Sequence, residues 1–280
     1  MKAGCIKGDE MSQTMAPITV EEIVAEIHDE CRLAIPVDYA GVPMGIVAAL
    51  LRRSPRKLDL LGVPTAGLLH DILIGSGLVR SLETSAVTLG EAGGAPCFMR
   101  AIANTSIQMK DSTCPAIHAG LTAAQKGSPF MTMRGLIGTD VLLQRSDWKV
   151  MQNPFASNTD PVVIVPALHP DVSVFHAPMA DREGNVWIGR RRELAAMAYA
   201  SKKTYVTVER IVDSRFLDDE LTAAGVLPAL YVDGIAKVEK GAWPYGLWGE
   251  YSPDTVALQR YAQHAKTEEG FKQWISEVYA

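Results

Sequence analysis

Glu91 lies in the glycine-rich segment LGEAGGAP and is the first carboxylate in this sequence to consider for chemistry. Gly90, Gly93 and Gly94 beside it let backbone and ligand approach closely. We expect a strand over residues 86–89, and open α/β sheets bind ligands at the carboxyl ends of their parallel strands. The pattern indicates either a ligand-facing carboxylate or an ordinary solvated glutamate in a flexible loop.

Arg134 offers a cation at a second loop. It ends a predicted strand over residues 129–133 and is followed by Gly135 and Gly138. Its planar guanidinium suits bidentate binding of a carboxylate or a phosphate, and pairing with Asp140 is an equally good interpretation. Arg134 and Gly138 therefore stay candidates for substrate binding.

Histidine and cysteine side chains give weaker signals. His176 lies on a predicted apolar strand that His169 precedes, where a hydrogen-bonded core histidine is the favoured interpretation over a catalytic base. Cys114 precedes Pro115 at a helix start, which favours a lowered thiol pKa, but no histidine partner is recognisable and free cysteines are commonly buried.

No metal site is expected. The cysteines lie in no CxxC pair and have no histidine cluster beside them: Cys5, Cys31, Cys97 and Cys114. We interpret them as free thiols in a reducing compartment. Residues 181–185, DREGN, lack the spacing of a calcium loop and predict a β-turn with Gly184 at positive φ.

Composition limits the classes of partner. The chain has 280 residues, 48% of them hydrophobic and 21% charged, with a net charge of -5. This balance offers no electrostatic surface for nucleic acid. No apolar run reaches the roughly 18 residues that a membrane span needs. We expect a cytoplasmic globular protein.

Strands alternate with helices along most of the chain, which predicts an α/β fold with an open, mostly parallel sheet, helices on both faces and a loop-rich C-terminal cap. Residues 1–17 are expected to form a mobile leader and residues 18–280 a single domain. Helices are expected over residues 20–31, 66–75, 95–103, 115–125, 193–201, 254–266 and 268–278, and strands over residues 33–37, 57–63, 107–110, 129–133 and 204–208, besides residues 86–89. Apolar residues 162–168 and the strand from Val172 predict two adjacent strands in one buried sheet.

Several ordered segments resemble the alpha subunit of family I CoA-transferases, the glutaconate CoA-transferase type. The most specific is HPDVSVFHAPMADREGNVWI, at residues 169–188. It is joined by ALLRRSPRKLDLLG, LLHDILIGSGLVRSLETS, AGLTAAQKGSPFMTMRGLIGTDVL, RELAAMAYASKKTYVTVERIVD and GAWPYGLWGEYSPDTVALQRYAQHA. The resemblance covers nearly the whole chain from Thr19 onward.

The resemblance implies a specific division of labour. In that family the acyl-CoA thioester is attacked by a glutamate of the beta-type subunit, so this chain would hold no nucleophile and would form half of the cleft. Acyl-CoA and a carboxylic acid would be substrates, with CoA not a bound cofactor, and a beta-type subunit would be the partner. The aromatic loop at residues 243–251 suits either stacking on a base or an intersubunit contact.

Two positions depart from the family pattern. Its glycine-rich loop after the first strand is replaced here by Ile35, Pro36, Val37 and Asp38, and Pro36 cannot donate a backbone hydrogen bond to an acyl oxygen. Asp38 therefore joins the candidate binding residues. Cys114 stands near the place where ring-cleaving relatives are expected to carry a glutamate. A CoA-ester hydrolase or C–C cleaving subunit, or a non-catalytic binding subunit, stays an alternative to the transferase.

Overall fold

The computed structural model describes residues 15–279. Most of the expected leader at residues 1–17 lies outside this range. Where the description begins, Met15 donates a backbone hydrogen bond to Arg182 and Ile18 donates one to Ile235. No helix in residues 15–279 combines the length and the hydropathy that crossing a bilayer requires.

A nine-stranded sheet forms the body of the molecule. Its strands are β1 (Arg32–Pro36), β2 (Leu58–Val63), β3 (Val79–Thr84), β4 (Gln108–Asp111), β8 (Val172–Asp181), β9 (Val186–Trp187), β10 (Lys203–Val212), β11 (Val226–Leu227) and β12 (Gly234–Lys237). Parallel strands run in the order β4, β3, β2, β1, β8, β10, β12. Only β9 and β11 pair antiparallel, so the expected open, mostly parallel sheet is confirmed.

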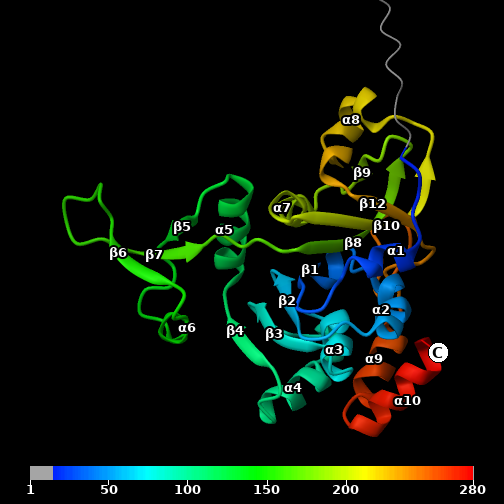
Figure 1. Ribbon diagram of the computed structural model, residues 1–280, viewed down its shortest axis with the longest axis horizontal. Coiled ribbons are helices and arrows are strands. Elements are labelled where there is room, and N and C mark those ends of the chain that lie inside the picture. The colour runs from blue at the N-terminus through cyan, green and yellow to red at the C-terminus, as the bar shows by residue number, and fades with distance from the viewer. Residues whose placement is uncertain (1–14, 280) are drawn as a thin grey trace, which may run out of the picture.

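Helices cover both faces of this sheet (Figure 1). One face packs against α1 (Val20–Ala25), α2 (Val47–Arg53), α3 (Leu68–Gly75), α4 (Pro96–Ala103), α9 (Thr255–His264) and α10 (Glu268–Tyr279). The other face packs against α5 (Cys114–Gln125) and α7 (Arg192–Ala200), and the short α8 (Glu220–Ala223) precedes β11. Because side chains alternate along a strand, Leu33 and Ile35 enter the first core while Ala34 between them enters the second.

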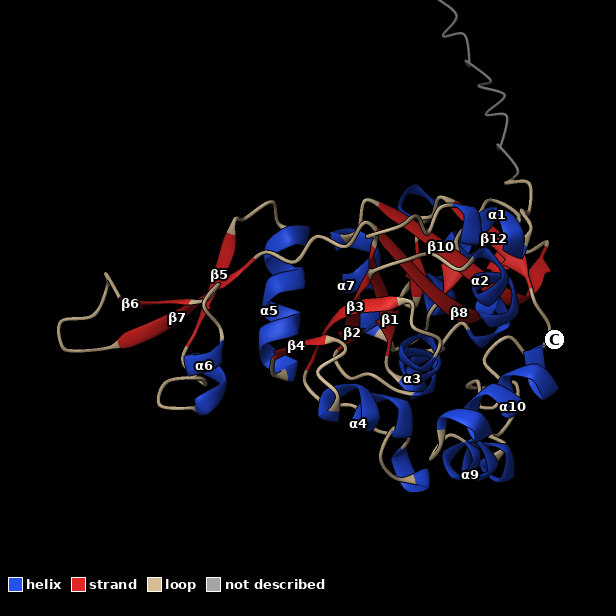
Figure 2. Cartoon of the chain, turned by 60° about the horizontal axis from the view of Figure 1, so that its bottom comes forward, coloured by secondary structure: helices blue, strands red, loops and turns tan. Residues whose placement is uncertain are grey.

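A small antiparallel sheet stands apart from this body (Figures 1 and 2). It consists of β5 (Phe130–Met133), β6 (Lys149–Gln152) and β7 (Pro161–Pro166), in the order β5, β7, β6, with α6 (Asp140–Gln144) beside it. Leu136, Trp148 and Val163 belong to its own buried cluster. We call this part of the chain, residues 129–168, the arm.

The arm corrects one expectation. The apolar run at residues 162–168 and the strand from Val172 were expected to be neighbours in one sheet, but β7 belongs to the arm and β8 to the main sheet. Pro170 lies between them and has no backbone N–H to continue a ladder. The hydrophobic run is buried because β7 pairs with β5 and β6.

A buried ion-pair network joins the arm to the main sheet. Arg145, 4% exposed, donates to Glu83 Oε1 at 2.8 Å, to Asp147 and to the Asp111 carbonyl oxygen. Arg32 Nη2 donates to Glu83 Oε2 at 2.7 Å. Both oxygens of this buried carboxylate therefore have charged partners, which a carboxylate inside a protein needs.

The same network explains why the strand expected at residues 86–89 is wrong. The strand is β3, Val79–Thr84, and the later segment makes only an isolated bridge from Val87 to Ala66. The sequence VRSLET carries charges that argue against a buried strand, yet Glu83 is buried by its arginine partners. Val79 and Leu82 of this strand enter the hydrophobic core, and the ion pairs make the burial of Glu83 possible.

The first helix is shorter than the expected residues 20–31. Thr19 and Glu22 form the expected capping box, but α1 ends at Ala25. Glu30 then has a φ of 63°, a left-handed conformation that turns the chain into β1. Elsewhere the expected helices and strands match the structure to within a few residues.

Candidate active site

A cavity of about 810 Å³ lies beyond the carboxyl ends of β1 and β3. Its walls are Asp38 and Tyr39 after β1, the turn at residues 89–92 after β3, Arg191, and much of the segment at residues 245–259. Open parallel sheets bind ligands at this edge. The expected aromatic loop therefore lines a cavity, and we call this site the cleft.

Asp38 is a partly buried acid in the cleft wall. Its Oδ1 is buried and has no hydrogen-bond partner among the described residues. Gly67 makes room for the carboxyl group, because a Cβ at Gly67 would lie 1.9 Å from Oδ1. Burial raises the pKa of Asp38 to about 7, against the opposing effects of the Tyr245 hydroxyl and the Leu68 N–H. Asp38 can therefore gain or lose a proton near neutral pH.

Glu91 lies across the cleft in a 3-10 turn, Gly90–Ala92. Gly90 and Gly93 both have positive φ, a conformation that glycine adopts without strain. The Glu91 side chain is exposed and has no ion pair with any described residue. Both interpretations of Glu91 therefore hold in part. Its carboxylate is solvated, and it also forms part of the cleft wall.

Arg191 is a cation of the cleft that the sequence did not single out. Its Cζ lies 3.4 Å from the centroid of the Trp248 ring, a cation–π contact. Its Nε is buried and unpartnered within residues 15–279, as is the Trp248 Nε1. Burial lowers the pKa of Arg191, and the neighbouring Arg190 adds to this effect.

A hydrogen-bonded network, His176 with Thr207, Glu209 and Tyr251, lies behind the cleft wall; we call it the His176 network. His176 is fully buried, with Nδ1 2.8 Å from the Thr207 hydroxyl and Nε2 2.7 Å from Glu209 Oε1. Glu209 also accepts from the Tyr251 hydroxyl at 2.9 Å and from the backbone N–H groups of residues 240 and 241. The sequence predicted that His176 is structural, and its complete set of partners agrees with that interpretation.

These contacts fix the charge of Glu209. Burial alone would raise its pKa, but the hydrogen bonds from His176, the Lys240 N–H and Tyr251 hold the pKa at about 2. Gly241 is required beside the ring, because a Cβ there would lie 2.4 Å from His176 Cε1. The His176 network therefore fixes the loop that carries Tyr251 into the cleft wall.

Arg134 and Gly138 lie in the arm and not in the cleft. The Arg134 guanidinium forms a bidentate pair with Asp160, at 2.9 and 2.5 Å, so the alternative partner Asp140 was wrong. Arg134 lines a second cavity of about 630 Å³ with Met151. Gly138 has a φ of 79°, with open space around it.

Cys114 is exposed, which corrects the expectation that burial accounts for this thiol. Its Sγ lies 3.1 Å from the Ser85 hydroxyl at the carboxyl edge of the sheet. His169 is exposed and lies before β8. The turn at residues 181–185 is the expected one: Gly184 has a φ of 91°, and Asp181 Oδ1 accepts the N–H groups of residues 183 and 185.

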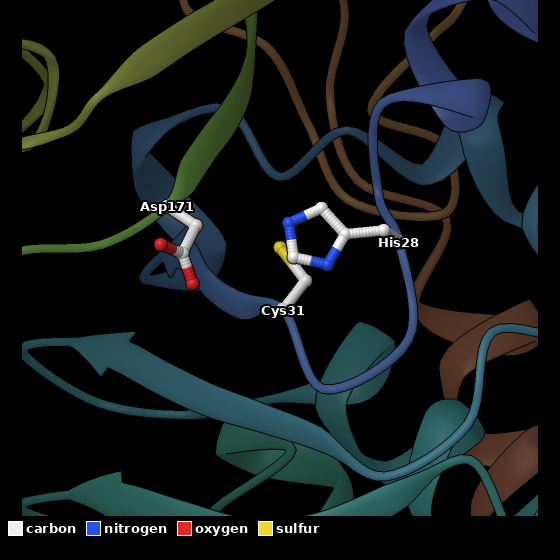
Figure 3. Close-up of side chains that lie close together, drawn as sticks. All are labelled: His28, Cys31 and Asp171. Atoms are coloured by element: carbon white, nitrogen blue, oxygen red, sulfur yellow. The ribbon is translucent and has the colours of Figure 1, made fainter.

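His28, Cys31 and Asp171 come together at the opposite, amino edge of the sheet (Figure 3). Their potential ligand atoms lie within 4.8 Å of one another, whereas no histidine cluster was expected beside the cysteines. Both Asp171 oxygens already accept hydrogen bonds, from Lys202 at 2.7 Å and from the Arg32 N–H at 2.9 Å. Burial raises the pKa of the Cys31 thiol to about 12. Both oxygens of Asp171 are thus already engaged by protein donors.

Comparison with known proteins decides the family. The family model described as Coenzyme A transferase matches residues 18–238 of this chain. The chain belongs to the Coenzyme A transferase family. The resemblance of the ordered segments to this family is therefore confirmed.

Two relatives and one solved structure show which proteins this chain is similar to. It is 29% identical to one of the subunits of the 3-oxoadipate CoA-transferase of Pseudomonas knackmussii, over 93% of this chain and 92% of that protein. It is 27% identical to the cholesterol ring-cleaving hydrolase IpdA subunit of Rhodococcus jostii, over 84% and 81%. Glutaconate coenzyme A-transferase from Acidaminococcus fermentans matches with a TM-score of 0.86 and 26% identity, over 94% of this chain and 88% of that one.

The structure thus brings Asp38 and Glu91 together and leaves Arg134 and Gly138 elsewhere. Of the residues that sequence reasoning missed, Arg191 had one usable signal: it belongs to the run RRR that follows the apolar strand VWI. Glu209 had none, because only the parallel pairing of β8 with β10 brings it to His176. Pairing across a crossover cannot be deduced from local pattern.

Proposed function

We propose that this chain is the alpha-type subunit of an acyl-CoA:carboxylate CoA-transferase. A separate beta-type subunit supplies the nucleophilic glutamate, and acyl-CoA and a carboxylic acid are the substrates. CoA acts as a substrate and is not a resident cofactor. The observation that carries the proposal is the cleft at the carboxyl edge of the sheet in a member of this family.

The proposed chemistry gives this chain a supporting role. The partner's glutamate attacks the thioester carbonyl, the CoA thiolate leaves, and a mixed anhydride forms. The thiolate then attacks the glutamyl carbonyl, releasing the first acid and leaving a glutamyl-CoA thioester. The second acid repeats the sequence in reverse and departs as its CoA ester. Every step depends on keeping water away from the anhydride.

The cleft suits that requirement. Aromatic residues from the segment at residues 245–251 form one wall, and the His176 network fixes this segment from behind. An apolar wall that does not move keeps water from the anhydride, so that the acid acceptor takes the acyl group. Asp38 and Glu91 are proposed to contact the acyl group and the acceptor. Arg134 and Gly138 stay candidates for substrate binding at the arm.

A second function is favoured by one observation. Asp38 has a pKa of about 7 and an unpartnered oxygen, so it can exchange a proton at neutral pH, which hydrolysis or C–C bond cleavage of a CoA ester requires and anhydride transfer does not. The relative named as a ring-cleaving hydrolase subunit makes this alternative concrete. The family's glycine loop is also replaced here by residues 35–38.

Isotope transfer separates these functions. The chain is purified alone and after co-expression with a beta-type subunit, and the passage of label from a free acid into acyl-CoA is measured. We expect no transfer by the chain alone and transfer by the assembly. Transfer by the chain alone contradicts the two-subunit proposal.

Two further outcomes identify the alternatives. Release of free CoA without any acceptor acid indicates the hydrolase. An assembly that binds acyl-CoA but neither transfers nor hydrolyses it indicates a non-catalytic subunit. Glu91→Gln should slow the active assembly, whereas Glu269→Gln, an exposed carboxylate on α10 remote from the cleft wall, serves as the matched control.

A further inference from the structure

Arg191 forms no ion pair with a described carboxylate, in contrast to several other arginines of the cleft and the arm. Arg134 pairs with Asp160, Arg145 with Glu83, and Arg210 with Glu250. Within residues 15–279 no carboxylate lies within 4 Å of the Arg191 guanidinium, and its buried Nε has no acceptor. An unpaired, partly buried cation is unfavourable unless another group compensates for the lost water.

The Trp248 ring compensates only in part for the water that the Arg191 guanidinium loses. It also sets the orientation of this guanidinium. The guanidinium lies over the indole ring, with its Cζ 3.4 Å from the ring centroid, which stabilises the cation through the ring face. This stacking uses a face of the guanidinium and not its N–H edges. Those edges are the part of arginine that binds planar or tetrahedral oxyanions in bidentate fashion.

The surroundings of Arg191 favour an anion that comes from outside the chain. The neighbouring Arg190 and Glu193 act on Arg191 with opposite charges, and Glu250 in the cleft wall is already paired with Arg210. Asp38 lines the same cavity but lies against Gly67 on the side of β1 and α3. The cleft therefore contains a positioned guanidinium whose N–H donors are not used by any side chain of residues 15–279.

We propose that Arg191, stacked on Trp248, binds an anionic group of the substrate. This inference rests on the proposed function, because it identifies part of the substrate for that same cleft. An oxyanion of the right size comes from two sources: a carboxylate at the far end of the acyl group, or a phosphate of CoA. With either source of the anion, Arg191 is a binding residue. The partner's glutamate attacks the acyl carbonyl.

The experiment uses the two-subunit assembly and four thioesters: glutaryl-CoA, pentanoyl-CoA and the pantetheine esters of both acids. Arg191→Met removes the charge, and Arg191→Lys keeps the charge but loses the fork. Arg190→Met, at an exposed arginine next in the chain, is the matched control. Because a charge-assisted pair is lost, Arg191→Met should lower kcat/KM by about 10- to 100-fold for the esters that carry the recognised anion, mainly through KM.

The pattern across the four esters assigns the anion. A loss for both glutaryl esters but neither pentanoyl ester identifies the distal carboxylate, whereas a loss for both CoA esters but neither pantetheine ester identifies a phosphate. Arg191→Lys should lose less than Arg191→Met, and Arg190→Met should change little. An equal loss for all four esters, or no loss, overturns the proposal.

Two measurements distinguish a failure of this proposal from the loss of a subunit contact and from a failure of the proposed function. If Arg191→Met separates the two chains on gel filtration, Arg191 pairs with the partner chain, which overturns the substrate assignment. If the unaltered assembly transfers no acyl group, the proposed function fails, but the anion site is still tested by titrating Trp248 fluorescence with glutarate or CoA. The bound anion should quench Trp248 fluorescence. This quenching should saturate in the unaltered chain and be absent in Arg191→Met and in Trp248→Phe.

Discussion

The cleft and the His176 network are two polar clusters built from the same C-terminal loop, and they differ in how completely their hydrogen bonds are satisfied. In the His176 network, Glu209 accepts from a ring nitrogen, a hydroxyl and two backbone N–H groups. In the cleft, Asp38 Oδ1, Arg191 Nε and Trp248 Nε1 are all buried without a partner among the described residues.

This difference indicates that the His176 network stabilises the fold, whereas the cleft binds a ligand. Buried polar groups in native proteins almost always have partners, so a group without one needs an explanation. A satisfied network contributes stability and position. Unsatisfied groups gathered at one cavity destabilise the chain until a ligand supplies the missing contacts. Variants of satisfied and unsatisfied groups should therefore differ in their effect on the free energy of unfolding.

The largest effect is expected in the Arg145 network, which is satisfied in the same way as the His176 network. Arg145→Met should lower the free energy of unfolding by about 3 to 5 kcal/mol, because it leaves Glu83 buried with one charged partner instead of two. Urea unfolding measures the change. A loss below about 1 kcal/mol would show that the arm does not depend on this pair.

Glu209→Gln should cost about 3 kcal/mol at pH 7, because the amide places a donor against the donors of the His176 network. The pKa of Glu209, about 2, lies below its ordinary value of 4.5. The contribution of Glu209 is therefore complete above about pH 5 and is lost as the pH falls through about 2. Urea unfolding at pH 7, 4 and 3 should show that the difference in free energy of unfolding between variant and parent becomes smaller as the pH falls. Tyr251→Phe, which removes one donor, should cost about 1 kcal/mol.

Asp38→Asn should have the opposite sign. Because burial raises the pKa of Asp38 to about 7, the charged carboxylate destabilises the fold as the pH rises from about 4 through 7. The variant should equal the parent at pH 4 and exceed it by about 1 to 3 kcal/mol at pH 8. Thermal unfolding at both pH values measures this. A variant less stable than the parent at pH 8 would place Asp38 among the structural residues.

The smallest effect is expected at the arm surface. Arg134→Met breaks a bidentate pair, but the Arg134 side chain is 67% exposed, so the loss should stay below about 1 kcal/mol. This variant is the exposed counterpart of Arg145→Met. If it also raises KM for acyl-CoA in the assembly, the arm takes part in binding as the sequence suggested. Unchanged kinetics would restrict substrate binding to the cleft.

Much of the fold could be predicted from the sequence because hydrophobic period and caps are local signals. The capping box at Thr19 and the alternation in β1 gave correct elements. The exceptions have non-local causes. β3 carries Glu83, which only distant arginines make compatible with burial, and β7 is buried by the strands of the arm and not by the main sheet.

Less of the candidate site could be predicted, for the same reason. Asp38 follows β1, whose end could be located from the sequence, whereas Glu91 was found through its glycine-rich turn although the strand expected before it was misplaced. Arg191 reaches the cleft through its contact with Trp248, 57 positions later in the chain, which no local pattern reveals. Arg134 looked equivalent to a binding arginine until the structure placed Asp160 beside it.

Hydrogen–deuterium exchange of the two-subunit assembly, with and without acyl-CoA, tests most directly whether the unsatisfied cluster is the ligand site. We predict slower exchange on binding at residues 38–41, 89–93 and 245–252, with little change at residues 130–134 and 150–155 of the arm. Within β8 and β10, around His176 and Glu209, exchange should already be slow without ligand. Protection confined to the arm, or absent from the cleft, would contradict the account.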